Sequence, residues 1–91
     1  MRIIWSSKAL GDLVRLQAFL EPVNPRAASA VFERLTSAPD LLLLQPRMGS
    51  PLPEFMPRDV RRLIVGNYEL RYELLQDEIW VLRLWSTRED R

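Results

Sequence analysis

The chain has 91 residues, of which 47% are hydrophobic and 27% charged, and its formal net charge at pH 7 is +1. This length fits one domain with a thin core, and the composition is too apolar for intrinsic disorder. The sequence contains no cysteine and no histidine, which excludes disulfides, thiolate or imidazole metal sites and a serine-histidine triad, so we expect no metal and no cofactor.

The basic residues are almost all arginine, since twelve of the thirteen are arginine and only Lys8 is lysine. The planar fork of arginine suits carboxylate and phosphate partners, although a GC-rich genome would also favour its codons. No stretch approaches the roughly 18 apolar residues that a membrane helix needs, and the N-terminus lacks the pattern of a secretory signal. We therefore expect a cytoplasmic protein without a membrane partner.

The N-terminal part predicts a strand followed by a helix. The short apolar run Arg2–Trp5 is rich in strand-forming residues, and Ser6 or Ser7 then offers a hydroxyl that can cap a helix. From Lys8 onward apolar residues recur at helical spacing until Pro22. These residues are Leu10, Leu13, Val14, Leu16 and Phe19.

A second helix is predicted from Asn24-Pro25, because asparagine can cap a helix and proline is favoured at the first helical position. Its apolar residues are Ala27, Ala28, Val31, Phe32 and Leu35. The short connection predicts a helical hairpin. The following prolines, beginning with Pro39, predict an interruption of regular structure. Within that stretch Leu41–Leu44 either extends the second helix or forms a turn of its own.

The C-terminal part alternates apolar and polar residues and predicts three strands, at Val60–Val65, Tyr68–Leu74 and Ile79–Trp85. Gly66-Asn67 and Gln76-Asp77 form the turns between them. In the middle strand the tyrosines and leucines point one way and the charged residues the other, which predicts one apolar face covered by the helices. The sequence therefore predicts one α+β domain over residues 1–91, ordered β-α-α-β-β-β, with two layers and a mostly antiparallel sheet.

The last predicted strand is apolar on both faces. Strict alternation puts Arg83 on one face with Ile79, Val81 and Trp85. The opposite face carries Trp80, Leu82 and Leu84. A strand of this kind is usually central, and the N-terminal strand is the only spare element that can cover its free side.

Four short segments follow one another across nearly the whole chain. They are NPRAA at the start of the second helix, PRMGSPLPE in the loop, VRRLIVGNYELRYEL in the hairpin and VLRLWSTREDR at the end. Each alone is only a good helix start, turn or strand, but the four in register resemble the RelE/ParE superfamily of type II toxin-antitoxin toxins. The resemblance implies the same fold that the periodicity predicts, with the first strand beside the last.

The superfamily contains two activities. RelE-like members cut messenger RNA in the ribosomal A site, whereas ParE-like members bind and poison DNA gyrase. RNA cleavage without a metal needs an acid-base residue, and Ser86 stands where many relatives carry histidine in a WHxRED pattern. Tyr68 and Tyr72 alternate with Leu70 on the predicted core face, so we interpret them as packing residues. We expect a ParE-like gyrase inhibitor without a chemical step of its own.

Two alternatives stay open. One is a RelE-like ribosome-dependent mRNA endonuclease that holds phosphate with Arg61, Arg83 and Arg88. The other is a non-toxic relative that keeps only antitoxin binding, which the unusual Ser86 would suit.

Arginines and the charged end of the chain are the candidate target contacts. The side of the sheet that faces away from the helices is polar and is called the wet face below. If Arg61 and Arg83 share the wet face with Arg71, they form a cationic patch for phosphate or for an acidic partner. Ion pairing with Glu69 and Glu73 would instead neutralise them. The final STREDR is either a solvated tail or a contact element. The full set of expected target contacts is Arg61, Arg83, Trp85, Ser86, Arg88, Glu89, Asp90 and Arg91.

The resemblance also implies a ParD-like antitoxin in a hetero-oligomer with the toxin. Its flexible C-terminal segment would wrap the helices and the sheet edge with apolar and acidic side chains. Expected antitoxin contacts are Leu13, Leu16, Phe19, Leu20, Val31, Phe32 and Leu35. Phe19 and Phe32 are either surface anchors or core residues, and for either one alone we favour the core. We do not expect direct binding of nucleic acid.

Overall fold

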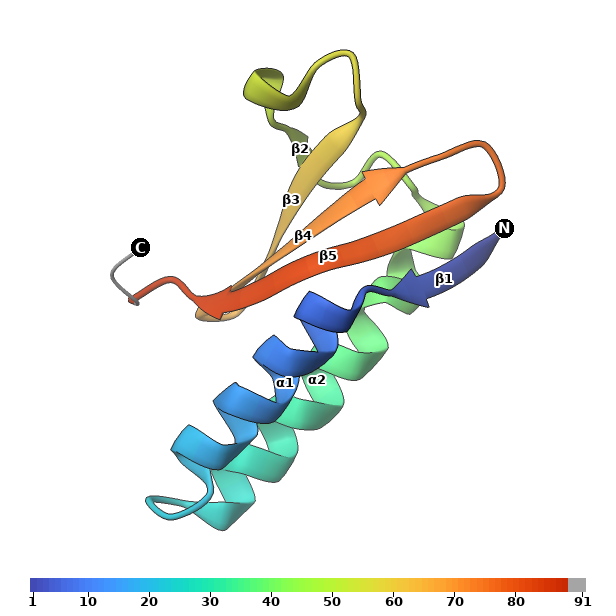
Figure 1. Ribbon diagram of the computed structural model, residues 1–91. Coiled ribbons are helices and arrows are strands. Elements are labelled where there is room, and N and C mark those ends of the chain that lie inside the picture. The colour runs from blue at the N-terminus through green and yellow to red at the C-terminus, as the bar shows by residue number, and fades with distance from the viewer. Residues whose placement is uncertain (89–91) are drawn as a thin grey trace.

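Two helices and a five-stranded sheet make up residues 1–88, the part of the chain that the computed structural model describes. In chain order the elements are β1 (Arg2–Trp5), α1 (Ser7–Leu20), α2 (Pro25–Leu44), β2 (Ser50–Pro51), the 3-10 turn η1 (Pro53–Phe55), β3 (Val60–Val65), β4 (Tyr68–Leu74) and β5 (Glu78–Ser86). The strand order is β1-β5-β4-β3-β2, and only the β1–β5 pair is parallel. Both helices lie on one side of the sheet, and their connecting end projects beyond it (Figure 1). The predicted two-layer α+β arrangement is confirmed, and the short β2 and η1 are additions to it.

Polar side chains set the two helix starts where the sequence predicts them. The Ser6 hydroxyl accepts a hydrogen bond from the Ala9 backbone N–H at 3.0 Å, and the Asn24 side chain accepts one from the Ala27 backbone N–H at 3.1 Å. Each bond satisfies a backbone donor that has no partner inside the helix. Because only four residues separate the helices, α1 and α2 run antiparallel as a hairpin.

Helix α2 continues through Pro39, where the sequence predicts a break, and Leu41–Leu44 forms its last turn. A proline inside a helix removes a backbone hydrogen bond and costs about 3 kcal/mol. Ala38, Pro39 and Leu42 are all buried. Their packing against the rest of the domain offsets the cost, because tertiary burial supplies most of the stability of a helix in a protein.

Strand β5 lies between β1 and β4, as its two apolar faces predict. A β-bulge interrupts its pairing with β4: Arg71 lies opposite Arg83, but Tyr72 lies opposite Val81, so Leu82 has no partner in the register. An extra residue of this kind reverses the alternation of side chains beyond it.

The bulge corrects one expectation about β5. Leu84 joins Ile79 and Val81 in the core under the helices, whereas the Trp85 ring lies on the other face of the sheet, against Arg71. Strict alternation would have put Trp85 beside Ile79 and Val81, and that prediction is wrong.

The core lies between the helix hairpin and the sheet. Its buried members are Ala9, Leu13, Leu16, Leu35, Ala38, Leu42, Leu70, Tyr72, Ile79, Val81 and Leu84. Tyr68 and Leu74 pack against this cluster, which confirms the predicted apolar face of β4.

Candidate functional site

Arg61 lies on the helix-facing side of β3 and is held by nearby backbone. Its Nε donates to Asp59 Oδ1 at 2.9 Å, and its NH1 donates to the carbonyl oxygens of Gly49 at 2.9 Å and Arg47 at 3.3 Å. Only 15% of the side chain is exposed. The guanidinium therefore fixes the loop after α2 to the sheet, and the condition that Arg61 shares the wet face with Arg71 is not met.

The wet face carries Arg62 beside Arg71, because these two residues lie opposite each other in β3 and β4. Glu69 places a carboxylate oxygen 3.7 Å from each guanidinium. Arg58 donates two hydrogen bonds to Glu73, at 2.8 and 3.1 Å. Ion pairing with the two glutamates is confirmed, and it involves Arg71 as predicted, but Arg58 and Arg62 take the places expected for Arg61 and Arg83.

Arg83 is paired with helix α1. Its Nε and NH2 donate to the two carboxylate oxygens of Asp12 at 2.8 and 3.1 Å, and the Leu84 backbone N–H donates to the same carboxylate at 2.9 Å. Strand β1 ends at Trp5, opposite Val81, so it does not reach this part of the edge of β5. Asp12 supplies an acceptor that a neighbouring strand would otherwise provide.

Asp12 is only 5% exposed. Burial raises the pKa of the carboxyl, but the hydrogen bonds from Arg83 and Leu84 and the charges of Arg83 and Arg15 outweigh it, so the pKa of Asp12 lies below its ordinary value. The charged carboxylate joins α1 to β5. Nothing in the local sequence of α1 predicts this burial, because the partner that explains it lies 71 residues away in the chain.

Ser86 and Arg88 line a groove of about 560 Å³, which we call the α1–β5 groove. Its other lining residues are Arg15, Leu16, Phe19, Leu20, Asn67 and Tyr68. The Thr87 N–H donates to the Asn67 carbonyl at 2.8 Å, and the Arg88 N–H donates to Ser86 Oγ at 3.2 Å. The chain is thus hydrogen-bonded to its surroundings as far as Arg88. The expected contacts Glu89, Asp90 and Arg91 lie outside the described residues.

The expected antitoxin contacts fall into three groups. Leu13, Leu16 and Leu35 belong to the core, with 7%, 4% and 0% of their surfaces exposed, so their assignment as partner contacts is corrected. Phe19 is 74% exposed and Phe32 36%, so the favoured core placement of Phe19 is wrong and Phe32 lies at the boundary. The two remaining members, Leu20 and Val31, are half-buried.

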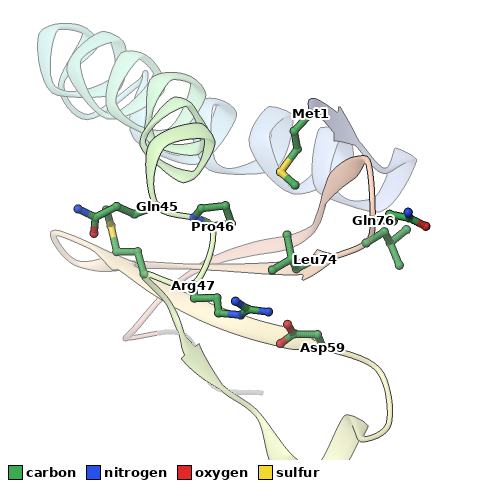
Figure 2. Close-up of a pocket in the computed structure, with 9 residues that line it drawn as sticks. Met1, Gln45, Pro46, Arg47, Asp59, Leu74 and Gln76 are labelled. Atoms are coloured by element: carbon green, nitrogen blue, oxygen red, sulfur yellow. The ribbon is translucent and has the colours of Figure 1, made fainter.

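A second depression, of about 650 Å³, lies at the opposite end of the strands (Figure 2). Its lining residues are Met1, Gln45, Pro46, Arg47, Met48, Asp59, Leu74, Leu75 and Gln76. Figure 2 shows the Arg47 guanidinium near Asp59, whose carboxylate is already paired with Arg61. None of the contacts expected from the sequence lies here.

The tyrosines of β4 act as packing residues, as predicted. Tyr72 is fully buried, its hydroxyl donates to the Pro46 carbonyl at 2.7 Å, and it accepts the Gly49 N–H at 2.9 Å. Burial raises the pKa of Tyr72 above its ordinary value. Among residues 1–88 no group of three or more carboxylates could hold a metal ion, and no helix is long and apolar enough to cross a membrane.

Comparison with known proteins identifies a protein family whose sequence profile matches the chain. The sequence profile described as "ParE toxin of type II toxin-antitoxin system, parDE" matches residues 3–91. A solved structure described as "Chromosomal ParDE TA system from P. aeruginosa" superposes with a TM-score of 0.78 at 21% identity, over 94% of this chain and 95% of that one. No curated protein matches the chain. At this identity the likeness to the solved structure bears on the fold alone.

Proposed function

Because the chain belongs to the ParE toxin family of type II toxin-antitoxin systems, we propose that it inhibits growth by binding DNA gyrase in the cytoplasm and that a ParD-like antitoxin neutralises it. The family match over residues 3–91 carries this proposal. The α1–β5 groove supports a shared binding surface for the two proposed partners, since exposed Phe19 and Arg88 line the same depression. An antitoxin segment that covers Phe19 would then also cover the target-binding side chains.

The antitoxin surface is the outer part of the helix hairpin. Val14 and Phe19 in α1 and Val23 in the connection to α2 are 66%, 74% and 83% exposed, which makes them candidate apolar contacts for a partner. Among residues 1–88 the groove lining has two arginines and no acidic residue. A segment with apolar anchors and acidic side chains complements this surface.

Titration of the cognate antitoxin into purified toxin tests this surface. We expect Phe19→Ala to raise the Kd about tenfold or more, as loss of a central anchor does, while the melting temperature stays unchanged. Leu44→Ala is the matched control, because Leu44 is 83% exposed at the other end of the hairpin and should leave binding unaltered. Equal weakening by both variants would refute the location.

The target contacts of the proposal are Ser86, Arg88 and the residues that follow. Binding without a chemical step is supported by the state of the candidate groups: the Tyr72 hydroxyl is buried between backbone partners, and Arg61 and Arg83 are paired within the domain. Arg88 is exposed and lines the groove.

A chain truncated after Arg88 provides the test of the target. This end point keeps Ser86 in β5 and keeps the Thr87 bonds to Asn67, so the fold should persist. We expect the intact toxin to inhibit DNA supercoiling by gyrase, and both the truncated chain and Arg88→Ala to lose most of that inhibition while still binding antitoxin. Intact toxin that cleaves mRNA in translating ribosomes and leaves supercoiling untouched would establish the RelE-like alternative. Intact toxin inactive in both assays would indicate a non-toxic antitoxin-binding relative.

A further inference from the structure

Arg71 is clamped between two aromatic rings on the wet face of the sheet. The centre of its guanidinium lies 5.2 Å from the centroid of the Phe55 ring and 4.7 Å from that of the Trp85 ring. Phe55 comes from the turn η1 and Trp85 from β5, so two elements far apart in the sequence hold one side chain of β4. Stacking of this kind fixes the plane of the guanidinium and leaves its edge for hydrogen bonding.

The edge of that guanidinium has no hydrogen-bond acceptor among residues 1–88. The Arg71 Nε is buried without a partner, and the nearest carboxylate oxygen, on Glu69, is 3.7 Å from NH2, which is beyond hydrogen-bond distance. A buried donor without an acceptor costs about 1–3 kcal/mol. Three other arginines on or beside the sheet are satisfied differently, since Arg58, Arg61 and Arg83 all make hydrogen bonds of 3.1 Å or less.

The surroundings favour one carboxylate over a nucleic-acid strand. Arg62, whose side chain is 50% exposed, lies beside Arg71 and shares Glu69 with it, while Arg58 is neutralised by Glu73. This face therefore has only one more positive than negative charge. A phosphodiester backbone needs several unneutralised cations, and the two glutamates would repel it. A single carboxylate needs only a planar fork of donors.

We propose that Phe55, Arg62, Arg71 and Trp85 form a binding site for the carboxylate of an aspartate or glutamate side chain in an acidic segment of a partner protein; this site is called the Arg71 clamp below. Because Nε is buried while 23% of the Arg71 side chain is exposed, the carboxylate pairs with the terminal nitrogens of the guanidinium, and Arg62 adds a second donor from the solvent side. Ile64 on β3, 53% exposed, provides an adjacent contact for an apolar residue of the same segment. The clamp is separate from the α1–β5 groove and does not depend on gyrase being the target.

The experiment observes the Arg71 Nε–H directly, by NMR of the 15N-labelled protein. The probe is a blocked peptide, acetyl-Leu-Glu-Asp-Leu-amide, and its partner is the uncharged peptide with Gln and Asn in place of Glu and Asp. We expect the acidic peptide to shift the Arg71 signal saturably, with a Kd in the millimolar range, and the uncharged peptide to leave it in place.

Substitutions distinguish recognition by the planar guanidinium from attraction to any positive charge. Arg71→Lys keeps the charge but loses the fork and should weaken binding of the acidic peptide about tenfold or more. Arg26→Lys, at the exposed start of α2, is the control and should bind as the parent protein does. Arg71→Lys also loses the stacking on the aromatic rings, which could affect folding. The change in the Arg71 signal of the parent protein on addition of the acidic peptide does not depend on whether a variant folds.

Three results would overturn the inference. They are an Arg71 signal that does not move, an equal response to the uncharged peptide, and a short oligothymidine that shifts the signal at lower concentration than the acidic peptide. The last would make the clamp a phosphate site. All three readouts use isolated protein and report neither toxicity nor supercoiling, so they fail independently of the proposed function.

Discussion

Removal of the Asp12 carboxylate should destabilise the protein more than removal of any other carboxylate in residues 1–88. Asp12→Ala deletes the charge-assisted pair with Arg83 and leaves the Leu84 N–H buried without an acceptor. Arg83 remains 45% exposed, so water can solvate its guanidinium and the loss on that side is small. Hydrogen bonds to a charged group contribute about 1.5–3 kcal/mol and an orphaned buried donor costs about 1–3 kcal/mol, which together give a loss of roughly 3 kcal/mol. In a domain of this size each kcal/mol lowers the melting temperature by about 4–8 °C.

Thermal unfolding followed by circular dichroism measures this loss. We expect Asp12→Ala to melt roughly 12–24 °C below the parent protein. Asp40→Asn and Asp12→Asn form a matched pair, since Asp40 is exposed on α2, and only the change at Asp12 should lower the melting temperature substantially. An Asp12→Ala protein that melts within about 2 °C of the parent would show that the carboxylate does not hold α1 to β5.

Three further predictions concern pH and packing. The pKa of Asp12 is lower in the folded protein than in the unfolded chain, where it is about 3.9. The stability that the carboxylate contributes is therefore fully present above about pH 4 and is lost as the pH falls through the folded-state pKa. The difference in melting temperature between the parent protein and Asp12→Asn should accordingly narrow below about pH 4. Gly49→Ala should lower the free energy of unfolding, measured by chemical denaturation, by about 1–3 kcal/mol, because its Cβ would lie 2.7 Å from a backbone oxygen and from the Tyr72 ring. Gly11→Ala is the control, since its Cβ would have nothing within 4 Å, and it should stabilise the helix by about 0.5–1 kcal/mol. Tyr72→Phe should cost about 1–3 kcal/mol in the same measurement, since it orphans the Gly49 N–H, and a loss below about 0.5 kcal/mol would contradict the role of the hydroxyl.

Local rules predicted most of the fold. Helix starts at Ser6 and Asn24, the alternation of β4 and the Gly66 turn all depend on neighbouring residues, and each is confirmed. The continuation of α2 through Pro39 was missed because tertiary packing there offsets a local penalty. The bulge in β5 was missed because it is a property of two paired strands, and nothing in the sequence of β5 alone marks Leu82 as the extra residue.

The candidate site was harder to predict because arginine side chains are long and their partners are distant in sequence. Arg61 and Arg62 are adjacent, yet one turns to the loop after α2 and the other to the wet face. Phe19 fits the apolar pattern of α1 but lies in its last turn, next to the connection between the helices, and it is 74% exposed. The helical spacing of apolar residues does not show how much of the length of a helix packs against the sheet.

The pairing of the arginines decides which substitutions can report on function. Arg61 and Arg83 hold structural elements together, so a variant of either that loses toxicity would report on the folded loop or on helix α1 as much as on any partner. Arg62 and Arg71 reach Glu69 only at 3.7 Å, and at that distance their donors are left for a partner protein. This geometry predicts that Arg62→Ala loses toxicity with its melting temperature unchanged. It also predicts that Arg61→Ala loses toxicity together with a lowered melting temperature. The reverse pattern would mean that the wet face has no part in recognition and that the loop after α2 is the contact surface.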